Sequence, residues 1–352
     1  MTSTQNVPPQ SSAEVVANSA SSAARSHSTR GSGGGLLERY GLIGIFIAVA
    51  IVFAVLRPET FAQYTNFRSL SISYSVLAIA ALALIVPLVA GRFDISVGAN
   101  IGMSSIVAAS AMSRFDLPLW VAVLAGIATG ALVGVINGVL VAYLGVNAII
   151  GTLGVSIILQ GLMSAYTGGI PISSGLDPAL TNLSVSLIAG IPTLFIIMIL
   201  VAVITWFLLR QTPYGRYLEA VGSNLAAARL TGIPAKRIVF LSFVIAGSLA
   251  GVAGVLQIGA QGNADAATGT INFILPALAA AFLGATTWRP GTYNVGGTII
   301  ALYFLAMVVN GLSLLGVRPW VTDVFNGAAV IVAIVVSAQL RRRRTGSIEI
   351  GQ

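Results

Sequence analysis

The sequence contains no cysteine, which excludes disulfide bonds and thiolate metal ligands. The only histidine, His27, lies in a polar segment, so a site built on imidazole is not expected either. The phosphate-binding pattern GxxxxGK[ST] is also missing, and the chain therefore does not hold ATP by that motif. We predict no catalytic residue, no metal site and no cofactor in this chain, and we do not expect it to be an enzyme.

Charge is equally scarce. Charged residues make up 8% of the chain and hydrophobic residues 56%, whereas a soluble domain has about 25% charged residues. The mean hydropathy is +0.94. Apolar stretches of about 20 residues are long enough to cross a bilayer as helices, the form that satisfies every backbone hydrogen bond without water. The composition therefore predicts an all-α, polytopic membrane protein.

The apolar stretches divide the chain into about ten candidate spans, which we expect to form a compact bundle. They are 41–56, 70–90, 95–113, 118–143, 147–166, 191–209, 238–260, 271–288, 294–313 and 319–340. Residues 1–38 are polar and rich in serine, alanine and glycine, which predicts a disordered tail. Residues 39–340 form the predicted transmembrane domain, with a polar segment at 211–237, and 341–352 form a basic tail. An even number of spans places both termini on one side.

The basic residues predict which side that is. Fourteen of the 18 fall on the side of the termini, and four, Arg57, Arg68, Arg114 and Arg318, fall on the other. Since cytoplasmic loops carry an excess of lysine and arginine, we expect both termini to be cytoplasmic. The sequence pI of about 10.3 reflects this topology, and no nucleic-acid partner is expected.

Glycine recurs every fourth residue in the fourth span, at Gly126, Gly130, Gly134 and Gly138. A second series, Gly247, Gly251 and Gly254, follows in the seventh span. Residues four apart share one helix face, and glycine there lets two helix backbones approach closely. We interpret both series as packing faces.

Two turn-like segments resemble each other. "GRFDISVG" (91–98) and "GATTWRPG" (284–291) each carry glycines seven residues apart, and each precedes a helix rich in small residues. They are either traces of a duplicated half or two tight turns that both need glycine.

The polar side chains expected at depth are neutral. They are Asn137, Asn147, Thr152, Ser156, Gln160, Asn263, Asn272, Asn294 and Asn310. Such groups bond between helices or line a polar pathway, because an unpaired amide in an apolar medium costs several kcal/mol. As pathway residues we predict Asn137, Asn147, Gln160, Asn263 and Asn310, a set that suits an uncharged, polyhydroxylated solute better than an ion.

The segment 214–237, "YGRYLEAVGSNLAAARLTGIPAKR", is too polar to cross a membrane. Asn224 is a good N-cap, "LAAARL" favours helix, and Gly232 and Pro234 end it. A helix of less than two turns is marginal in water and needs support from its own bundle or from another protein.

At this segment the chain resembles a known family. "EAVGSNLAAARLTGI" (219–233) is similar to the EAxGxNxxAARLxGI motif of the ribose-type permeases, the membrane subunits of ATP-binding-cassette sugar importers. "AGRFDISVGA" (90–99), "NAIIGTLGVSIILQGL" (147–162), "AGSLAGVAG" (246–254) and "LGVRPWVTDVFNGAAVIVAI" (315–334) also fit, so the resemblance extends over about 60–340. The chain departs from the family's GGTSxxGG run at Ala285 and at Trp288, Arg289 and Pro290.

The resemblance implies a mechanism with several partners. Two permease copies, most simply a homodimer, would form the pathway for a monosaccharide or similar solute. A cytoplasmic ATPase holding ATP and magnesium would dock below, and a periplasmic binding protein would deliver the sugar. The matching motif positions imply an ATPase-coupling role for Glu219, Gly222, Asn224, Ala227, Ala228, Arg229 and Gly232. From the residues alone, an ion-coupled carrier or channel for a neutral solute stays an alternative.

Overall fold

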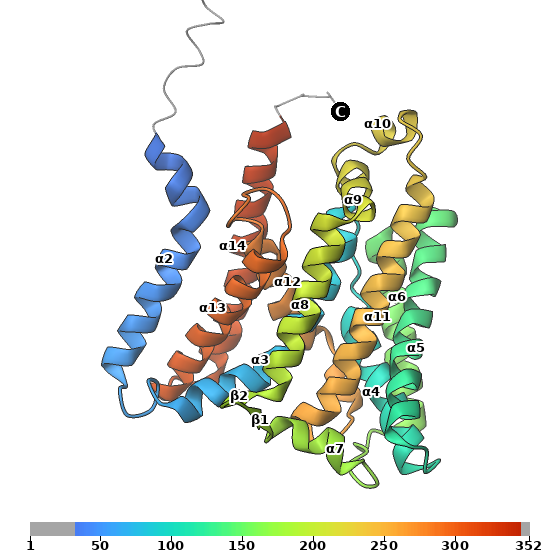
Figure 1. Ribbon diagram of the computed structural model, residues 1–352, viewed down its shortest axis with the longest axis vertical. Helices are drawn as coiled ribbons and strands as arrows, with labels where there is room; N and C mark the ends of the chain where they lie inside the picture. Colours follow the sequence, from blue (N-terminus) through green and yellow to red (C-terminus); the bar gives the residue numbers. More distant parts are fainter. Residues whose placement is uncertain (1–31, 346–352) are drawn as a thin grey trace, which may run out of the picture.

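The computed structural model describes residues 32–345, which form a bundle of helices running mostly between two ends of the molecule (Figure 1). The helical elements are α2 (Ser32–Leu56), α3 (Tyr64–Val89), α4 (Val97–Ser113), α5 (Leu119–Gly138), η1 (Val139–Tyr143), α6 (Ala148–Thr167), α7 (Pro178–Thr181), η2 (Asn182–Ser184), α8 (Thr193–Gln211), α9 (Pro213–Ser223), α10 (Leu225–Leu230), α11 (Ala235–Gln261), η3 (Ala266–Gly269), α12 (Ile271–Gly284), α13 (Val295–Leu314) and α14 (Pro319–Thr345). Two short antiparallel strands, β1 (Leu187–Ile188) and β2 (Ile191–Pro192), precede α8.

All ten predicted spans correspond to helices, which confirms the all-α membrane class. Among the described residues, eight helical segments are long and apolar enough to cross a bilayer, whereas the apolar part of α2 (Tyr40–Leu56) and α4 are shorter. The count of ten spans therefore stays a prediction. Helix α4 is almost wholly buried, so it is an interior element of the bundle.

The boundaries of the predicted tails need correction at both ends. Residues 32–38 belong to α2, and α14 continues through the run of arginines to Thr345. In each case the helix extends past its apolar part. Residues 1–31 and 346–352 lie outside the described part of the chain, and so does most of the predicted N-terminal tail. The first residues of α2 and the last of α14 lie at the same end of the bundle as α9 and α10 (Figure 1).

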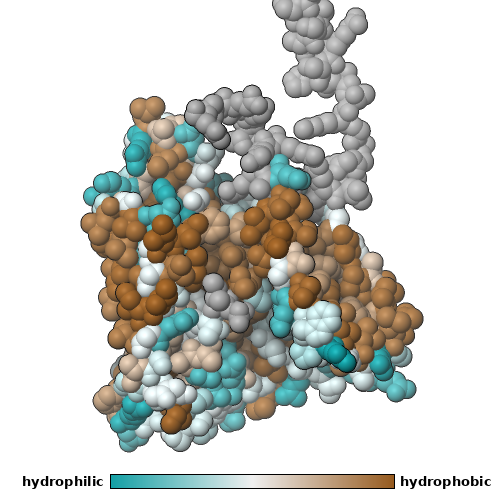
Figure 2. Space-filling view, turned by 180° about the vertical axis from the view of Figure 1, so that it is seen from behind, coloured by the Kyte–Doolittle hydropathy of each residue, from teal (hydrophilic) through white to brown (hydrophobic). Residues whose placement is uncertain are grey.

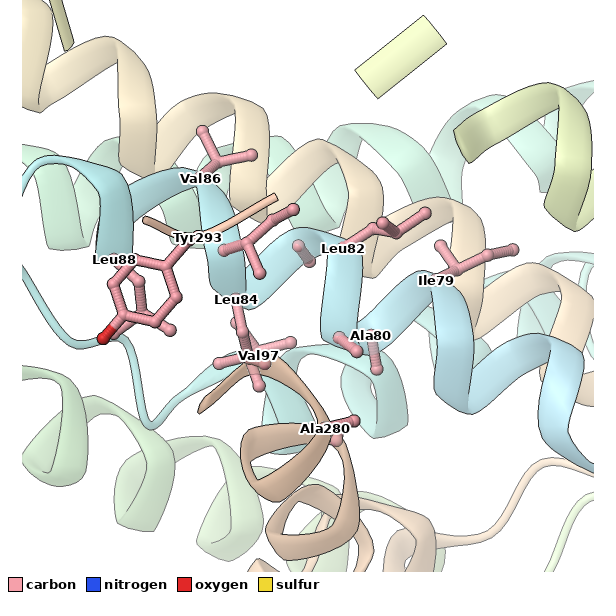
Figure 3. Close-up of a cluster of buried hydrophobic side chains, with 14 of the residues drawn as sticks. Ile79, Ala80, Leu82, Leu84, Val86, Leu88, Val97, Ala280 and Tyr293 are labelled. Atoms are coloured by element: carbon pink, nitrogen blue, oxygen red, sulfur yellow. The ribbon is translucent and has the colours of Figure 1, made fainter. Parts of the chain in front are cut away.

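Helix α3 forms the centre of the core. From Val76 to Leu88 every residue is buried, and a helix that is apolar on all sides is expected in such a position. Figure 3 shows its side chains against Val97 of α4, Ala280 of α12 and Tyr293 of the α12–α13 loop. The end of α3 is thus held from several sides, which positions the loop that follows it.

The two glycine series face each other across the contact between α5 and α11, which confirms the predicted packing face. A Cβ at Gly130 would be 2.6 Å from the Gly251 Cα, and one at Gly247 would be 2.8 Å from the Gly134 Cα. The helix backbones therefore touch directly. Gly254 departs from the pattern and packs on α4 at Ser104.

Large apolar side chains also cover the outside of the bundle. Helices α5, α6, α8 and α14 expose many of them, and Figure 2 shows hydrophobic residues over much of one face. Contiguous apolar surface of this extent is not stable in water. It agrees with a protein surrounded by lipid or by further membrane subunits.

Candidate functional site

Helix α10 is a short helix capped at both ends and lies at one end of the bundle (Figure 1). The Asn224 side chain accepts a hydrogen bond from the Ala227 N–H at 3.0 Å. Gly232 has a φ of +81°, the left-handed conformation that glycine adopts without a steric penalty. The predicted start and end of this helix are confirmed.

One face of α10 packs on the protein and the other is free. Ala228 is buried, whereas Arg229 and Leu230 are exposed. The Leu230 side chain is 90% exposed, the largest exposed fraction among the large hydrophobic residues that the structure describes. Leu230 was not among the predicted coupling residues, although it belongs to the motif. The sequence did carry a signal for it. Leu230 is an apolar residue next to Arg229, and it ends a helix that is too short to bury it.

Glu219 is not displayed as a free charge. Its carboxylate forms a salt bridge with Arg210 at 3.1 Å, which joins α9 to the end of α8. Because the Glu219 side chain is still 45% exposed, the pair contributes about 0–1 kcal/mol of stability. Within the described residues, the cations at this end of the bundle without a salt-bridge partner include Arg229, Lys236 and the half-buried Arg92. They line a cavity of about 440 Å³ between η1 and the loop that follows it, α10, the α3–α4 loop and the start of α11.

Gly222 makes a close backbone contact between α9 and the end of α3. A Cβ at this position would overlap the carbonyl oxygen of Val89, the last residue of α3. No larger residue fits unless α9 moves. The close contact joins the α9–α10 segment to the end of the central helix, immediately before the loop 90–96.

That loop contains a buried carboxylate, Asp94, which is only 3% exposed. Its Oδ1 accepts hydrogen bonds from the Ser96 N–H at 3.0 Å and the Ser96 hydroxyl at 2.6 Å. The Asn137 amide of α5 donates to the Ser96 hydroxyl at 2.7 Å and reaches Asp94 at 3.4 Å. The Ile95 N–H donates to the Thr152 hydroxyl of α6. The network therefore joins the loop to α5 and α6.

Burial raises the pKa of Asp94 to about 6, and the hydrogen bonds from Ser96 and Asn137 oppose this shift. A pKa above that of the unfolded chain means that the protonated form favours folding. This stabilisation is complete below about pH 4 and is lost as the pH rises through 6. Asp94→Asn keeps an acceptor but cannot ionise.

The free energy of unfolding of Asp94→Asn should rise relative to that of the natural protein as the pH increases. Between pH 5 and pH 8 we expect this relative gain to be about 1 kcal/mol. Thermal melts of both purified proteins at the two pH values measure this difference, in which all other titrating groups cancel. A difference in melting temperature that stays constant, or that shrinks toward pH 8, would contradict the assignment.

The predicted pathway residues do not meet at one site. Asn137 lies in the Asp94 network, and Asn147 caps α6 by accepting from Ile149 and Ile150. Gln160 donates to the Gly269 carbonyl of η3 at 2.8 Å. Asn263 follows α11, and Asn310 lies in α13 with its buried side-chain oxygen unpartnered among the described residues. Most of these bonds hold helices and loops together.

Asn294 and Asn100 also make hydrogen bonds that hold the structure together. Asn294 caps α13 and donates to the carbonyls of Gly284 and Thr287, while the side chain of Asn272 is outside the described set. Asn100, which the sequence analysis did not single out, is buried in α4 and donates to the Gly130 carbonyl at 3.1 Å. It thereby satisfies a backbone carbonyl in the glycine-lined contact of α5.

Comparison with known proteins agrees with the motif assignment. The family model described as the permease component of branched-chain amino acid transport systems matches residues 66–334. The ribose import permease protein RbsC of Escherichia coli K12 is 33% identical over 304 residues, which cover 86% of this chain and 94% of the relative. The D-allose transport system permease protein AlsC of the same strain is 29% identical over 299 residues, which cover 85% of this chain and 91% of the relative.

A third relative comes from another organism. The autoinducer 2 import system permease protein LsrD of Photorhabdus laumondii is 29% identical over 308 residues, again 85% of this chain and 91% of the relative. No solved structure matches the chain.

Proposed function

We propose that this chain is the membrane subunit of a sugar importer driven by ATP. The chain belongs to the family of permease components of branched-chain amino acid transport systems, which supports the proposal. Ribose and allose are named for two of its relatives, which supports a monosaccharide or similar polyhydroxylated solute as cargo. The neutral amides in the bundle favour such a solute over an ion.

The observation that carries the proposal is the exposed face of α10. A helix of six residues ends in a leucine that is 90% exposed, with Arg229 beside it and a cavity lined by three cations next to it. A surface of this kind fits a partner groove that takes an apolar anchor and carries acidic groups at its rim. Since the chain has no GxxxxGK[ST] motif, the partner would be the ATPase that holds ATP and magnesium.

The contacts behind α10 suggest how the partner's movement would reach the bundle. Helix α10 continues from α9, and α9 touches the end of α3 through Gly222 and Val89. The next loop carries Asp94, which the Ser96 and Asn137 bonds connect to α5. A displacement of α10 would therefore be transmitted by packed backbone and hydrogen bonds to helices α3, α5 and α6.

The assembly would contain two copies of this chain, an ATPase and a periplasmic sugar-binding protein, in a bacterial inner membrane. The end of the bundle with α9 and α10, and with it both termini, would face the cytoplasm. The excess of basic residues at that end supports this orientation. For the pathway we retain the five amides proposed from the sequence, Asn137, Asn147, Gln160, Asn263 and Asn310.

Transport in proteoliposomes tests this function. The chain is co-purified with the ATPase and binding protein encoded beside it, and uptake of labelled pentoses and hexoses is measured with ATP present. We expect uptake to need ATP and to persist when ionophores remove all ion gradients. Uptake that stops with the gradients while ATP is kept would indicate an ion-coupled carrier and refute the proposal.

A further inference from the structure

The residues that set this chain apart from the family pattern, Trp288, Arg289 and Pro290, line or border a second cavity. It measures about 480 Å³ and lies between the end of α8, Glu219 of α9, the last residue of α3, the α12–α13 loop and the start of α13. The α12–α13 loop lies toward the same end of the bundle as α9 (Figure 1). The cavity is distinct from the one beside α10, with which it shares no lining residue.

The cavity carries a surplus of positive charge. Arg210 and Arg289 both line it, and their guanidinium groups are close enough to repel each other. Glu219 neutralises Arg210 only. Within the described part of the chain, the Arg289 side chain has no hydrogen-bond or salt-bridge partner. An anion bound here would relieve the repulsion and pair with Arg289, and a guanidinium suits phosphate oxygens in particular.

Trp288 lines the cavity and has an unusual backbone conformation. This residue has a φ of +61°, a left-handed conformation that is unfavourable for a residue other than glycine. Its side chain is 51% exposed, and its ring lies over Gly296 of α13, where an added Cβ would be 3.6 Å from two ring carbons. The indole thus forms one wall of the cavity, while Trp206 of α8 lines another part.

The surroundings favour a lipid over a soluble anion. Helix α8 exposes Val203, Ile204 and Phe207 within two turns of Arg210, so the cavity lies where an outward apolar surface meets a charged helix end. Two tryptophans at that level are typical of a membrane–water interface. Acyl chains could lie along α8 while the headgroup phosphate enters the cavity.

We propose that this cavity binds the phosphate headgroup of an anionic phospholipid through Arg289 and Arg210, with Trp206 and Trp288 at the level of the glycerol. Basic pockets between transmembrane helices bind lipid headgroups in this way. The site needs neither the ATPase nor a transported solute, so it can be tested independently of the proposed function.

Tryptophan quenching by brominated lipids tests the proposal on the purified full chain in detergent. Brominated phosphatidylglycerol should quench fluorescence at lower concentration than brominated phosphatidylcholine, and Trp288→Phe should remove part of that quenching. Arg289→Gln should weaken phosphatidylglycerol binding about fivefold and leave phosphatidylcholine binding unchanged. Arg289→Lys, which keeps the charge, should bind phosphatidylglycerol more tightly than Arg289→Gln.

The matched control is Arg216→Gln, an exposed arginine of α9 outside the cavity lining. It makes the same charge change at the same end of the bundle and should leave binding unchanged. Equal quenching by the two lipids would overturn the site. An equal loss of phosphatidylglycerol binding in Arg289→Gln and Arg216→Gln would overturn it as well. Competition by millimolar inorganic phosphate that abolishes the preference for phosphatidylglycerol would show a free-anion site and overturn the lipid assignment.

Discussion

Leu230→Asp is expected to abolish ATP-dependent uptake while the protein still folds and reaches the membrane. The side chain makes little contact within the chain, so the bundle loses almost nothing. At a docked interface the change removes an apolar anchor and buries an unpaired carboxylate, which costs about 2 kcal/mol or more. The ATPase should bind at least about 30-fold more weakly. Co-purification of the ATPase and sugar uptake in proteoliposomes measure the two effects.

Val185→Asp is the control for this prediction. Val185 is also exposed, at 60%, and lies between η2 and β1 at the other end of the bundle. The same chemical change there should leave ATPase binding intact. Arg229→Glu should also uncouple uptake, because it reverses a charge next to Leu230. ATPase binding that survives both Leu230→Asp and Arg229→Glu would refute the docking role of α10.

Gly130→Val is expected to prevent the bundle from forming a stable fold. Its Cβ would be 2.6 Å from the Gly251 backbone and would overlap the Gly247 carbonyl oxygen. Backbone on a neighbouring helix cannot move aside as a side chain can, so α5 and α11 must separate along their whole contact. We expect a loss of about 3 kcal/mol or more, seen as a lower melting temperature or as aggregation during size-exclusion chromatography.

Gly161→Val separates this effect from the poor helix propensity of valine. Gly161 lies in α6, and nothing described lies within 4 Å of the position its Cβ would take. Both variants replace a helical glycine by valine, yet only one creates an overlap. Similar melting temperatures for the two variants would show that the glycine series is not a packing contact.

Much of this fold follows from local patterns in the chain. A long apolar run without charge is stable in a bilayer as a helix, because a helix satisfies its own backbone hydrogen bonds. The all-α membrane class and nearly all positions of the spans can therefore be predicted from the sequence. The cap of α10 is equally local, since Asn224 bonds within three residues of itself and Gly232 adopts its own φ. The four-residue glycine spacing on α5 also predicted a close helix contact, although not which helix would make it.

The candidate site depended on contacts between residues distant in sequence. Asp94 looks like a turn residue at a span end, but α5 and α6 close over it and bury it. Glu219 looks like a displayed charge, but the turn from α8 to α9 brings Arg210 to it. The predicted pathway amides share a chemical type, yet the fold distributes them between helix caps, a loop network and separate helices. The spacing of these amides in the sequence does not predict where they lie in the fold.

The sequence by itself determined that this chain is a helical membrane protein of a permease family with a short capped helix between two spans. Hydropathy, capping and motif spacing are properties of neighbouring residues, so they can be recognised without knowledge of the tertiary structure. Only the tertiary structure decided which polar groups are free to act. It left Leu230 and Arg229 exposed, buried Asp94, paired Glu219 with Arg210 and placed Arg289 in a cavity without a salt-bridge partner among the described residues. Burial and pairing depend on which helices pack together, and that is a property of the whole chain.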